Sequence, residues 1–209
     1  MTAAKTGGST EADAPTPDAL SEVHGLLSRC FEQPDDDTAD AIRSGRLVDA
    51  LRDRLADLGI ETEAPAVPDQ PRTAYLRTFD GFEGQYAPPA ESVYEPWWDG
   101  TERGILSGPA AHDMEARYDA IDAEIPPEYP PDHVALLLEY SSLLLERGAT
   151  DAYVRFHDEH FDWIPAFRER VERTSDIPMY TWAVRTLETV LDLTADRIDG
   201  SGSAGGDRP

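Results

Sequence analysis

Two histidines in one short segment offer the clearest pattern for metal chemistry. His157-Asp158-Glu159-His160 places histidines at i and i+3, so on a helix both side chains share one face beside two carboxylates. Zinc hydrolases of the HExxH type need histidines at i and i+4, and that spacing is absent. His160 is also in step with the apolar residues around it. The pattern favours a histidine at the edge of the core and leaves a metal-dependent hydrolase using His157 and His160 as a lower-ranked alternative.

Asp132 and His133 form a second candidate pair, directly after Pro130 and Pro131. The two prolines restrict the backbone before a strongly apolar segment. Asp132 is therefore expected near a helix N-terminus, where a carboxylate caps free N–H groups and is favoured by the helix dipole. His133 is expected in the first turn, at the solvent-facing rim. Local physics alone favours an ordinary helix start over a binding site.

Other catalytic patterns are missing from the sequence. Its glycines fit neither a phosphate-binding loop nor a dinucleotide fingerprint, and no GxSxG elbow occurs. Cys30 is the single cysteine, so neither an intrachain disulfide nor a cysteine-based metal cluster can form within one chain. Its apolar neighbours indicate a core residue. We therefore expect a binding protein without a cofactor or a bound metal.

The charge balance excludes several partners. The chain has 42 Asp and Glu against 18 Lys and Arg, a formal net charge of -24, and Lys5 is the only lysine. Nucleic acids and anionic membranes both require clustered basic residues, so neither is an expected partner. Abundant carboxylates with almost no lysine are typical of an extreme halophile, in which salt screens the repulsion. We expect folding to require high ionic strength.

Apolar periodicity predicts a single all-α domain. Residues 1–15 and 198–209 are rich in small and polar residues and are predicted to be disordered tails, which leaves a helical domain over 16–197. The N-terminus has no apolar signal segment, and no window approaches 18 consecutive apolar residues, so a cytoplasmic protein is expected. The apolar residues at spacings of three and four predict helices from Pro17, over 47–58, after Pro71, from Ala111, over 134–145, over 153–171 as one helix, and over 183–194.

Residues 80–108 differ from the rest of the chain. They are rich in Gly, Pro and aromatic residues and have no helical period. A loop of this length inside a compact domain is uncommon and is often functional. It also offers a hinge for a domain-swapped homodimer, and the sequence leaves the oligomeric state open.

Three segments carry a family resemblance. The first is Tyr75–Gly81 followed by Pro88–Tyr94, the second is Pro130–His133 leading into Leu138-Glu139-Tyr140, and the third runs from Phe156 and His157 through His160 and Trp163 to Phe167. In this order and spacing, on a helical background, they resemble the TorD/DmsD/NarJ family of redox-enzyme maturation chaperones. The resemblance spans about residues 18–195. Phe82 and Tyr129 stand where the family has a proline and often a glutamate, which leaves the subfamily open.

The resemblance implies a TorD-like helical bundle without enzymatic activity. It implies a cytoplasmic chaperone that binds the twin-arginine leader, the apo-form, or both, of a molybdopterin-containing oxidoreductase of the DMSO or TMAO reductase type. The chaperone would assist cofactor insertion before export. The alternative within the family is an assembly chaperone for a nitrate-reductase-type or leaderless subunit.

The resemblance also directs attention to one surface, where the 80–108 loop meets the helix after Pro131. The expected leader-binding residues are Asp132, His133, Pro130, Tyr94, Trp97, Trp98 and Ser92. Asp132 is expected to contact or orient a basic or amide group. His133 is expected to supply a hydrogen bond that varies near neutral pH. The aromatic residues are expected to supply apolar contact area, unless Tyr94 and one tryptophan fill the core beneath the loop.

Overall fold

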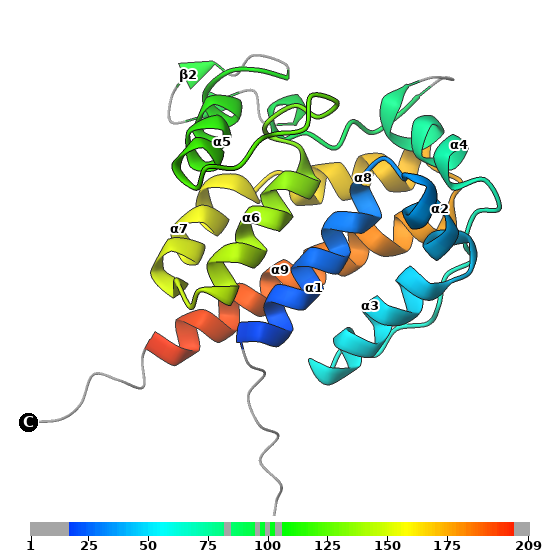
Figure 1. The fold of residues 1–209 in the computed structure, drawn as a ribbon, viewed down its shortest axis with the longest axis horizontal. Coiled ribbons are helices and arrows are strands. Elements are labelled where there is room, and N and C mark those ends of the chain that lie inside the picture. The colour runs from blue at the N-terminus through cyan, green and yellow to red at the C-terminus, as the bar shows by residue number, and fades with distance from the viewer. Residues whose placement is uncertain (1–16, 82–84, 95–96, 99–100, 103–105, 203–209) are drawn as a thin grey trace, which may run out of the picture.

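The computed structural model describes residues 17–81, 85–94, 97–98, 101–102 and 106–202 (Figure 1). These residues form an all-α bundle, which confirms the predicted fold class. The helices are α1 (Pro17–Phe31), α2 (Asp36–Arg43), α3 (Arg46–Asp57), α4 (Pro71–Tyr75), α5 (Pro109–Ala120), α6 (Val134–Glu146), α7 (Thr150–His160), α8 (Ile164–Thr174) and α9 (Pro178–Gly202). Among the described residues, none of the helices combines the length and apolarity that crossing a membrane requires.

The packing of α6 against α1 forms the centre of the bundle (Figure 1). The helix α6 is apolar nearly all round, as its sequence predicts, and its residues from Val134 to Leu138 are all buried. The two helices approach closely at a pair of serines. The Ser21 hydroxyl donates to the Ser142 carbonyl oxygen at 3.0 Å, and the Ser142 hydroxyl donates to the Ser21 carbonyl oxygen at 2.9 Å. These bonds fix the register of α1 on α6.

Cys30 lies in this core, with 1% of its surface exposed. Burial raises the pKa of its thiol to about 12. The thiol therefore stays protonated and packs as a small apolar side chain, as the sequence predicts.

The apolar stripe over 153–171 does not form one helix, so that prediction is wrong. The chain breaks between α7 and α8 at residues 161–163. Pro165 lies in the first turn of α8, where its missing N–H does no harm, but it cannot continue α7. The Trp163 indole N–H donates to the carbonyl oxygen of His160 at 2.7 Å, in the last turn of α7, where carbonyl groups need partners from outside the helix.

At the chain ends, α9 continues to Gly202, past the predicted domain end at residue 197. The tail predicted over residues 1–15 lies outside the described residues, and so do residues 203–209 of the predicted C-terminal tail.

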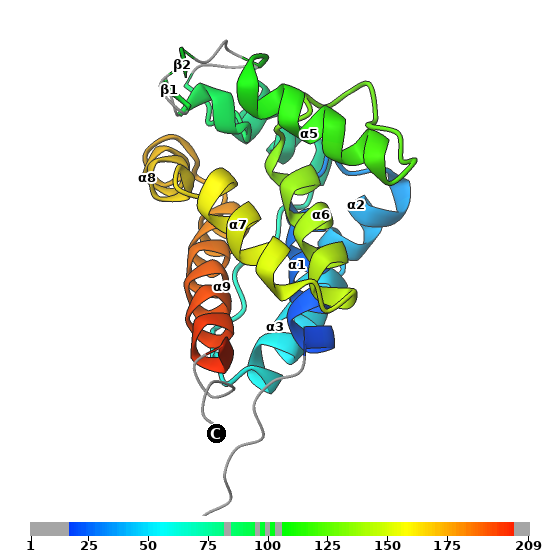
Figure 2. The same cartoon turned by 90° about the vertical axis from the view of Figure 1, so that its left-hand side faces the viewer.

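The 80–108 loop contains short elements of its own. They are the 3-10 turn η2 (Glu91–Val93) and the two-residue strands β1 (Trp97–Trp98) and β2 (Thr101–Glu102), which pair antiparallel. This hairpin and α5 together cover one end of the bundle (Figure 2). An isolated antiparallel β-bridge between Ala90 and His133 attaches the loop to the start of α6.

Before the loop, the chain makes a π-helical turn, η1 (Leu76–Asp80), which continues α4. Such turns are rare and occur often at functional sites. Gly81 ends the turn with φ +72°, and a Cβ atom at this position would lie 2.6 Å from the Tyr86 ring. Glycine is therefore required twice, for the left-handed backbone and for the approach of Tyr86.

Replacing Gly81 with alanine should cost more stability than replacing Gly59. Gly59 has a similar φ of +77°, but a Cβ atom there would have no heavy atom within 4 Å, so Gly59→Ala adds only backbone strain. We expect Gly81→Ala to lose about 1 kcal/mol more than Gly59→Ala in denaturant unfolding, because the Tyr86 ring must move. Equal losses would mean that Tyr86 is not held against this turn.

Candidate functional site

A cavity of about 430 Å³ opens where the π-helical turn, the 80–108 loop and the start of α6 meet. This cavity joins the π-helical turn and the adjoining loop to the start of α6, Gln33 and Arg170, which are distant in sequence. We call it the loop cavity, and its lining residues are Gln33, Tyr75, Phe79, Asp80, Tyr86, Pro88, Val93, Leu106, Glu128, Tyr129, Pro130, His133 and Arg170.

The wall of the loop cavity is mainly aromatic and apolar, and the exposed side chains of Asp80 and Glu128 stand at its rim. Leu106 is half exposed, at 50% of its surface. One cation also lines the cavity. The Arg170 Nε–H donates to the Tyr86 carbonyl oxygen at 2.8 Å, and its guanidinium lies 5.8 Å from the centre of the Tyr86 ring. Arg170 thus holds the loop wall in place.

Asp132 lies behind this wall rather than on it. Its side chain is fully buried, and its Oδ2 accepts a hydrogen bond from the Ser92 backbone N–H at 2.7 Å. Its carbonyl oxygen accepts from the Glu91 N–H at 3.1 Å. Its Oδ1 has no hydrogen-bond partner among the described residues. Asp132 therefore tethers η2 to the start of α6, and it does not cap α6.

His133 caps α6 instead. Its Nδ1 accepts from the Ala135 N–H at 3.2 Å, so Nε2 carries the proton and faces the Tyr75 hydroxyl at 3.4 Å. Burial lowers the pKa of His133 to about 3. The ring is therefore neutral at all but acidic pH. The expectation that its hydrogen bond varies near neutral pH is wrong, because the ring is enclosed rather than at a wet rim.

The other predicted site residues surround this joint. Pro130 lines the loop cavity, and the Ser92 hydroxyl accepts from the Leu106 N–H at 2.9 Å. Tyr94 stacks on Trp163 with ring centres 5.2 Å apart, and it is partly buried. Trp97 and Trp98 form β1, and their side chains lie outside the described residues. The structure thus brings Pro130, Ser92, Asp132 and His133 together, with Tyr94 packed on α8.

Sequence reasoning missed several residues of this region. The sequence predicts Tyr75 and Phe79 as part of a helix and of a segment that resembles the family, but not as residues of a binding site. It singles out neither Glu91 nor Arg170. Glu91 is fully buried. Because a fifth of the chain is acidic, the sequence does not show which single carboxylate is buried. The one available hint for Glu91 was its place in the Pro88–Tyr94 segment.

His160 lies in a buried charged network, and His157 does not. The His160 Nδ1 lies 2.7 Å from Glu91 Oε2, and its Nε2 lies 3.0 Å from Asp113 Oδ2. Ligand atoms of Asp113, Glu159 and His160 all lie within 4.8 Å of one another. Arg117 already donates to Asp113 and, at 2.7 Å, to Glu159 Oε2. The guanidinium thus supplies the positive charge that a metal ion would otherwise bring.

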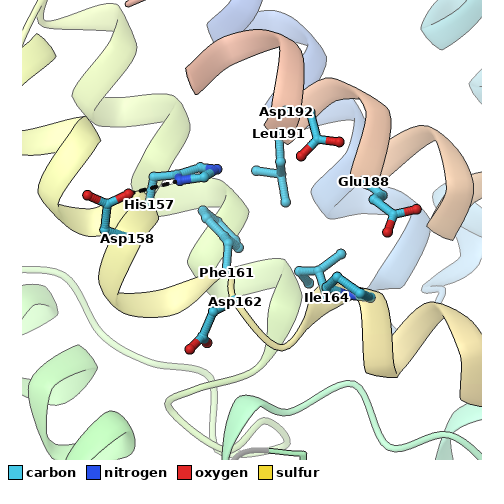
Figure 3. A pocket seen from close by; sticks show the side chains of 9 residues that line it. His157, Asp158, Phe161, Asp162, Ile164, Glu188, Leu191 and Asp192 are labelled. Carbon is cyan, nitrogen blue, oxygen red and sulfur yellow. Dashed lines mark ion pairs between the residues drawn. The ribbon is translucent and has the colours of Figure 1, made fainter. Parts of the chain in front are cut away.

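His157 instead lines a second hollow of about 310 Å³ between α7, α8 and α9 (Figure 3). Phe161, Ile164 and Leu191 form its apolar side, and the carboxylates of Asp158, Asp162, Glu188 and Asp192 surround them. The His157 ring faces its neighbour Asp158, with Nδ1 and Oδ1 3.6 Å apart. This hollow involves neither the 80–108 loop nor the start of α6.

The fold is similar to that of a solved structure. The structure resembles that of a candidate redox enzyme maturation protein from Archaeoglobus fulgidus, with a TM-score of 0.52 and 19% sequence identity. The match covers 90% of this chain and 97% of the other. The two chains thus share the same all-α fold. No curated protein matches the sequence.

The sequence identifies the family. The model of the nitrate reductase delta subunit family matches residues 33–172, and this chain belongs to that family. The family comprises NarJ/TorD-type chaperones for molybdoenzyme assembly and is not catalytic. The alternative of a metal-dependent hydrolase using His157 and His160 is therefore wrong.

Removing the Asp132 side chain should detach the loop from α6. We expect Asp132→Ala to lower the free energy of unfolding by about 1–3 kcal/mol, because the buried Ser92 N–H loses its acceptor. Asp132→Asn keeps an oxygen acceptor and should lose less. The exposed α5 control Glu115→Ala should change stability by less than about 0.5 kcal/mol in the same denaturant titration. If Asp132→Ala matches this control, the tether contributes nothing.

Proposed function

We propose that this chaperone binds the twin-arginine leader of a molybdopterin-containing oxidoreductase in the loop cavity. It acts in the cytoplasm and retains its client there until the cofactor is inserted. The observation that carries the proposal is the composition of the cavity. Its four aromatic residues are Tyr75 and Phe79, in a segment that carries the family resemblance, together with Tyr86 and Tyr129, and two carboxylates stand at its rim.

The chemistry of a leader matches this arrangement. A twin-arginine leader joins a pair of guanidinium groups to an apolar, helix-forming stretch. Apolar side chains can be buried against Tyr75, Phe79 and Tyr129, while the arginines face Asp80 and Glu128. Most of the binding free energy then comes from the apolar contacts. Rim carboxylates contribute orientation and a faster encounter.

Asp132, His133 and Ser92 have an indirect role in this proposal. Asp132 orients the loop wall through Ser92. His133 holds the Tyr75 hydroxyl, whose own proton is then available to donate to a leader carbonyl. Tyr94 supports the wall through Trp163, and Trp97 and Trp98 remain proposed contacts.

A second candidate client is a nitrate-reductase-type or leaderless subunit. The match to the nitrate reductase delta subunit family favours it. In this case the loop cavity would bind an apolar segment of the catalytic subunit itself. An arginine pair would then not be required for binding.

Peptide titration tests the proposal and separates the two clients. The probe is a synthetic peptide with an Arg-Arg pair before an apolar segment, and its match has Gln-Gln in place of the pair. At the lowest salt at which the protein stays folded, we expect calorimetry to show tighter binding of the Arg-Arg peptide. The double variant Asp80→Asn/Glu128→Gln should weaken this binding by roughly 3- to 10-fold.

The rim effect should be specific to charge and position. Added salt should abolish the difference between the double variant and the wild type, because it screens exposed charges. Glu115→Gln, an exposed change on α5 outside the cavity lining, should leave affinity unchanged. Equal affinity for both peptides would favour the leaderless client. Absence of binding to either peptide would contradict the loop cavity as a leader site.

A further inference from the structure

His160 joins three elements that are separate in the sequence. It ends α7, and its ring lies between Glu91 of η2 and Asp113 of α5, at 2.7 Å and 3.0 Å. The side chains of His160 and Glu91 are both fully buried, at 0% exposure. A neutral imidazole has one N–H and cannot donate to both carboxylates, whereas an imidazolium donates to both. With both carboxylates ionised, this geometry requires a protonated ring.

Further charged residues on α5 and α7 extend the network around His160. On α5, Arg117 pairs with Asp113 and reaches Glu159 of α7 at 2.7 Å. On the α6 side the neighbours are aromatic, and the Arg117 guanidinium lies 5.7 Å from the centre of the Tyr140 ring. Burial by itself lowers the pKa of His160, but the hydrogen bonds and charges of Asp113 and Glu91 outweigh it and raise that pKa. Burial by itself raises the pKa of Asp113, but the hydrogen bonds and charges of His160 and Arg117 outweigh it and lower that pKa.

The two other fully buried histidines behave in the opposite way. Burial lowers the pKa of His24 to about 4 and that of His133 to about 3. Within the described part of the chain, the hydrogen-bond partners of His24 are uncharged, the Leu20 carbonyl oxygen and the Tyr153 hydroxyl. At neutral pH these two rings are therefore uncharged, whereas the raised pKa of His160 favours its protonated form. His24 provides a matched control for a substitution at His160.

The bridge lies directly behind the loop cavity. Glu91 is the first residue of η2, and Val93 in the same turn lines the cavity. Ser92, between them, receives the Leu106 N–H on its hydroxyl, and Leu106 also lines the cavity. A shift of Glu91 would therefore move two parts of the cavity wall.

We propose that the Glu91–His160–Asp113 bridge positions the wall of the loop cavity. The bridge holds η2 against α5 and α7 while His160 is protonated. It loosens the attachment of η2 when His160 loses its proton. His160 would then be a positioning residue that makes client binding depend on pH. This inference rests on the proposed function only for the identity of the cavity's client. The coupling of His160 to the wall is a property of the unliganded chain.

The direction of the pH effect follows from the raised pKa of His160. A group whose pKa is higher in the folded state contributes stability that is complete below its unfolded value, near 6.5 for histidine. That contribution is lost as pH rises through the folded value. The wall should therefore be firmest below about pH 6.5 and loosen as pH rises through the raised pKa of His160, while Asp113 stays ionised.

Hydrogen exchange tests the bridge without any client. The reporter amides are Ser92 N–H, bound to Asp132, and Leu106 N–H, bound to Ser92. As pH rises above about 6.5, the ordinary pKa of histidine, we expect their protection factors to fall relative to those of α6 amides. In His160→Gln, whose amide never carries charge, they should be low and independent of pH. Glu91→Gln and Asp113→Asn should show the same loss.

The control separates positioning from ordinary stability. His24→Gln should lower the melting temperature but keep the wild-type pH dependence at Ser92 and Leu106. If the His160 variant loses protection equally in all helices, or keeps the wild-type pH profile, the proposal is overturned. If His160→Gln does not fold, Asp113→Asn decides the matter, because Asp113 is only partly buried.

Binding of the Arg-Arg peptide then connects the device to function. Wild-type affinity should fall with the protection factors as pH rises, and His160→Gln should bind weakly at every pH. If peptide affinity does not change with pH although the protection factors of the reporter amides do, the proposed link between His160 and client binding is overturned. If the peptide binds to no variant, the proposed client is wrong, whereas the exchange result still decides whether His160 holds the wall.

Discussion

The architecture around the loop cavity depends on one buried carboxylate. Asp132 has no exposed surface, and burying a polar side chain costs free energy unless hydrogen-bond donors compensate it. The Ser92 N–H supplies one such donor. The backbone of the loop also runs alongside the start of α6, where the Val134 N–H donates to the Pro89 carbonyl oxygen at 2.8 Å. Because Pro130 and Pro131 stiffen the chain before this point, the loop is attached to a fixed position on α6.

Two further contacts secure the same turn from other directions. Glu91 meets His160 at the end of α7, and Tyr94 stacks on Trp163 just before α8. Trp163 in turn donates to the His160 carbonyl oxygen, so the break between α7 and α8 supports the loop from both sides. A segment with only short elements of secondary structure can thus form a defined wall, because α6, the end of α7 and α8 each contact one of its residues.

The sequence predicts most of the helices but little of this arrangement. Apolar spacing locates α1, α3 and α6, since their buried faces are continuous, and it merges α7 with α8, since the stripe continues across Pro165. The Pro-Pro-Asp-His pattern locates the joint between the loop and α6, yet local reasoning makes Asp132 the cap of α6 and places His133 at a solvent-facing rim. Its actual partner, Ser92, is 40 residues away and only the fold brings it near. Glu91 is indistinguishable in sequence from the many solvated carboxylates of the chain.

Photo-crosslinking tests the central claim, that the client lies in the loop cavity, most directly. An Arg-Arg peptide with a photoreactive group next to the pair would be irradiated with the full chain, and the joined residues identified by mass spectrometry. We predict adducts within residues 75–80, 86–93 and 128–133, competed by unlabelled peptide. Adducts confined to the hollow lined by His157, Phe161 and Asp192 would contradict the account, because that hollow shares no residue with the loop cavity.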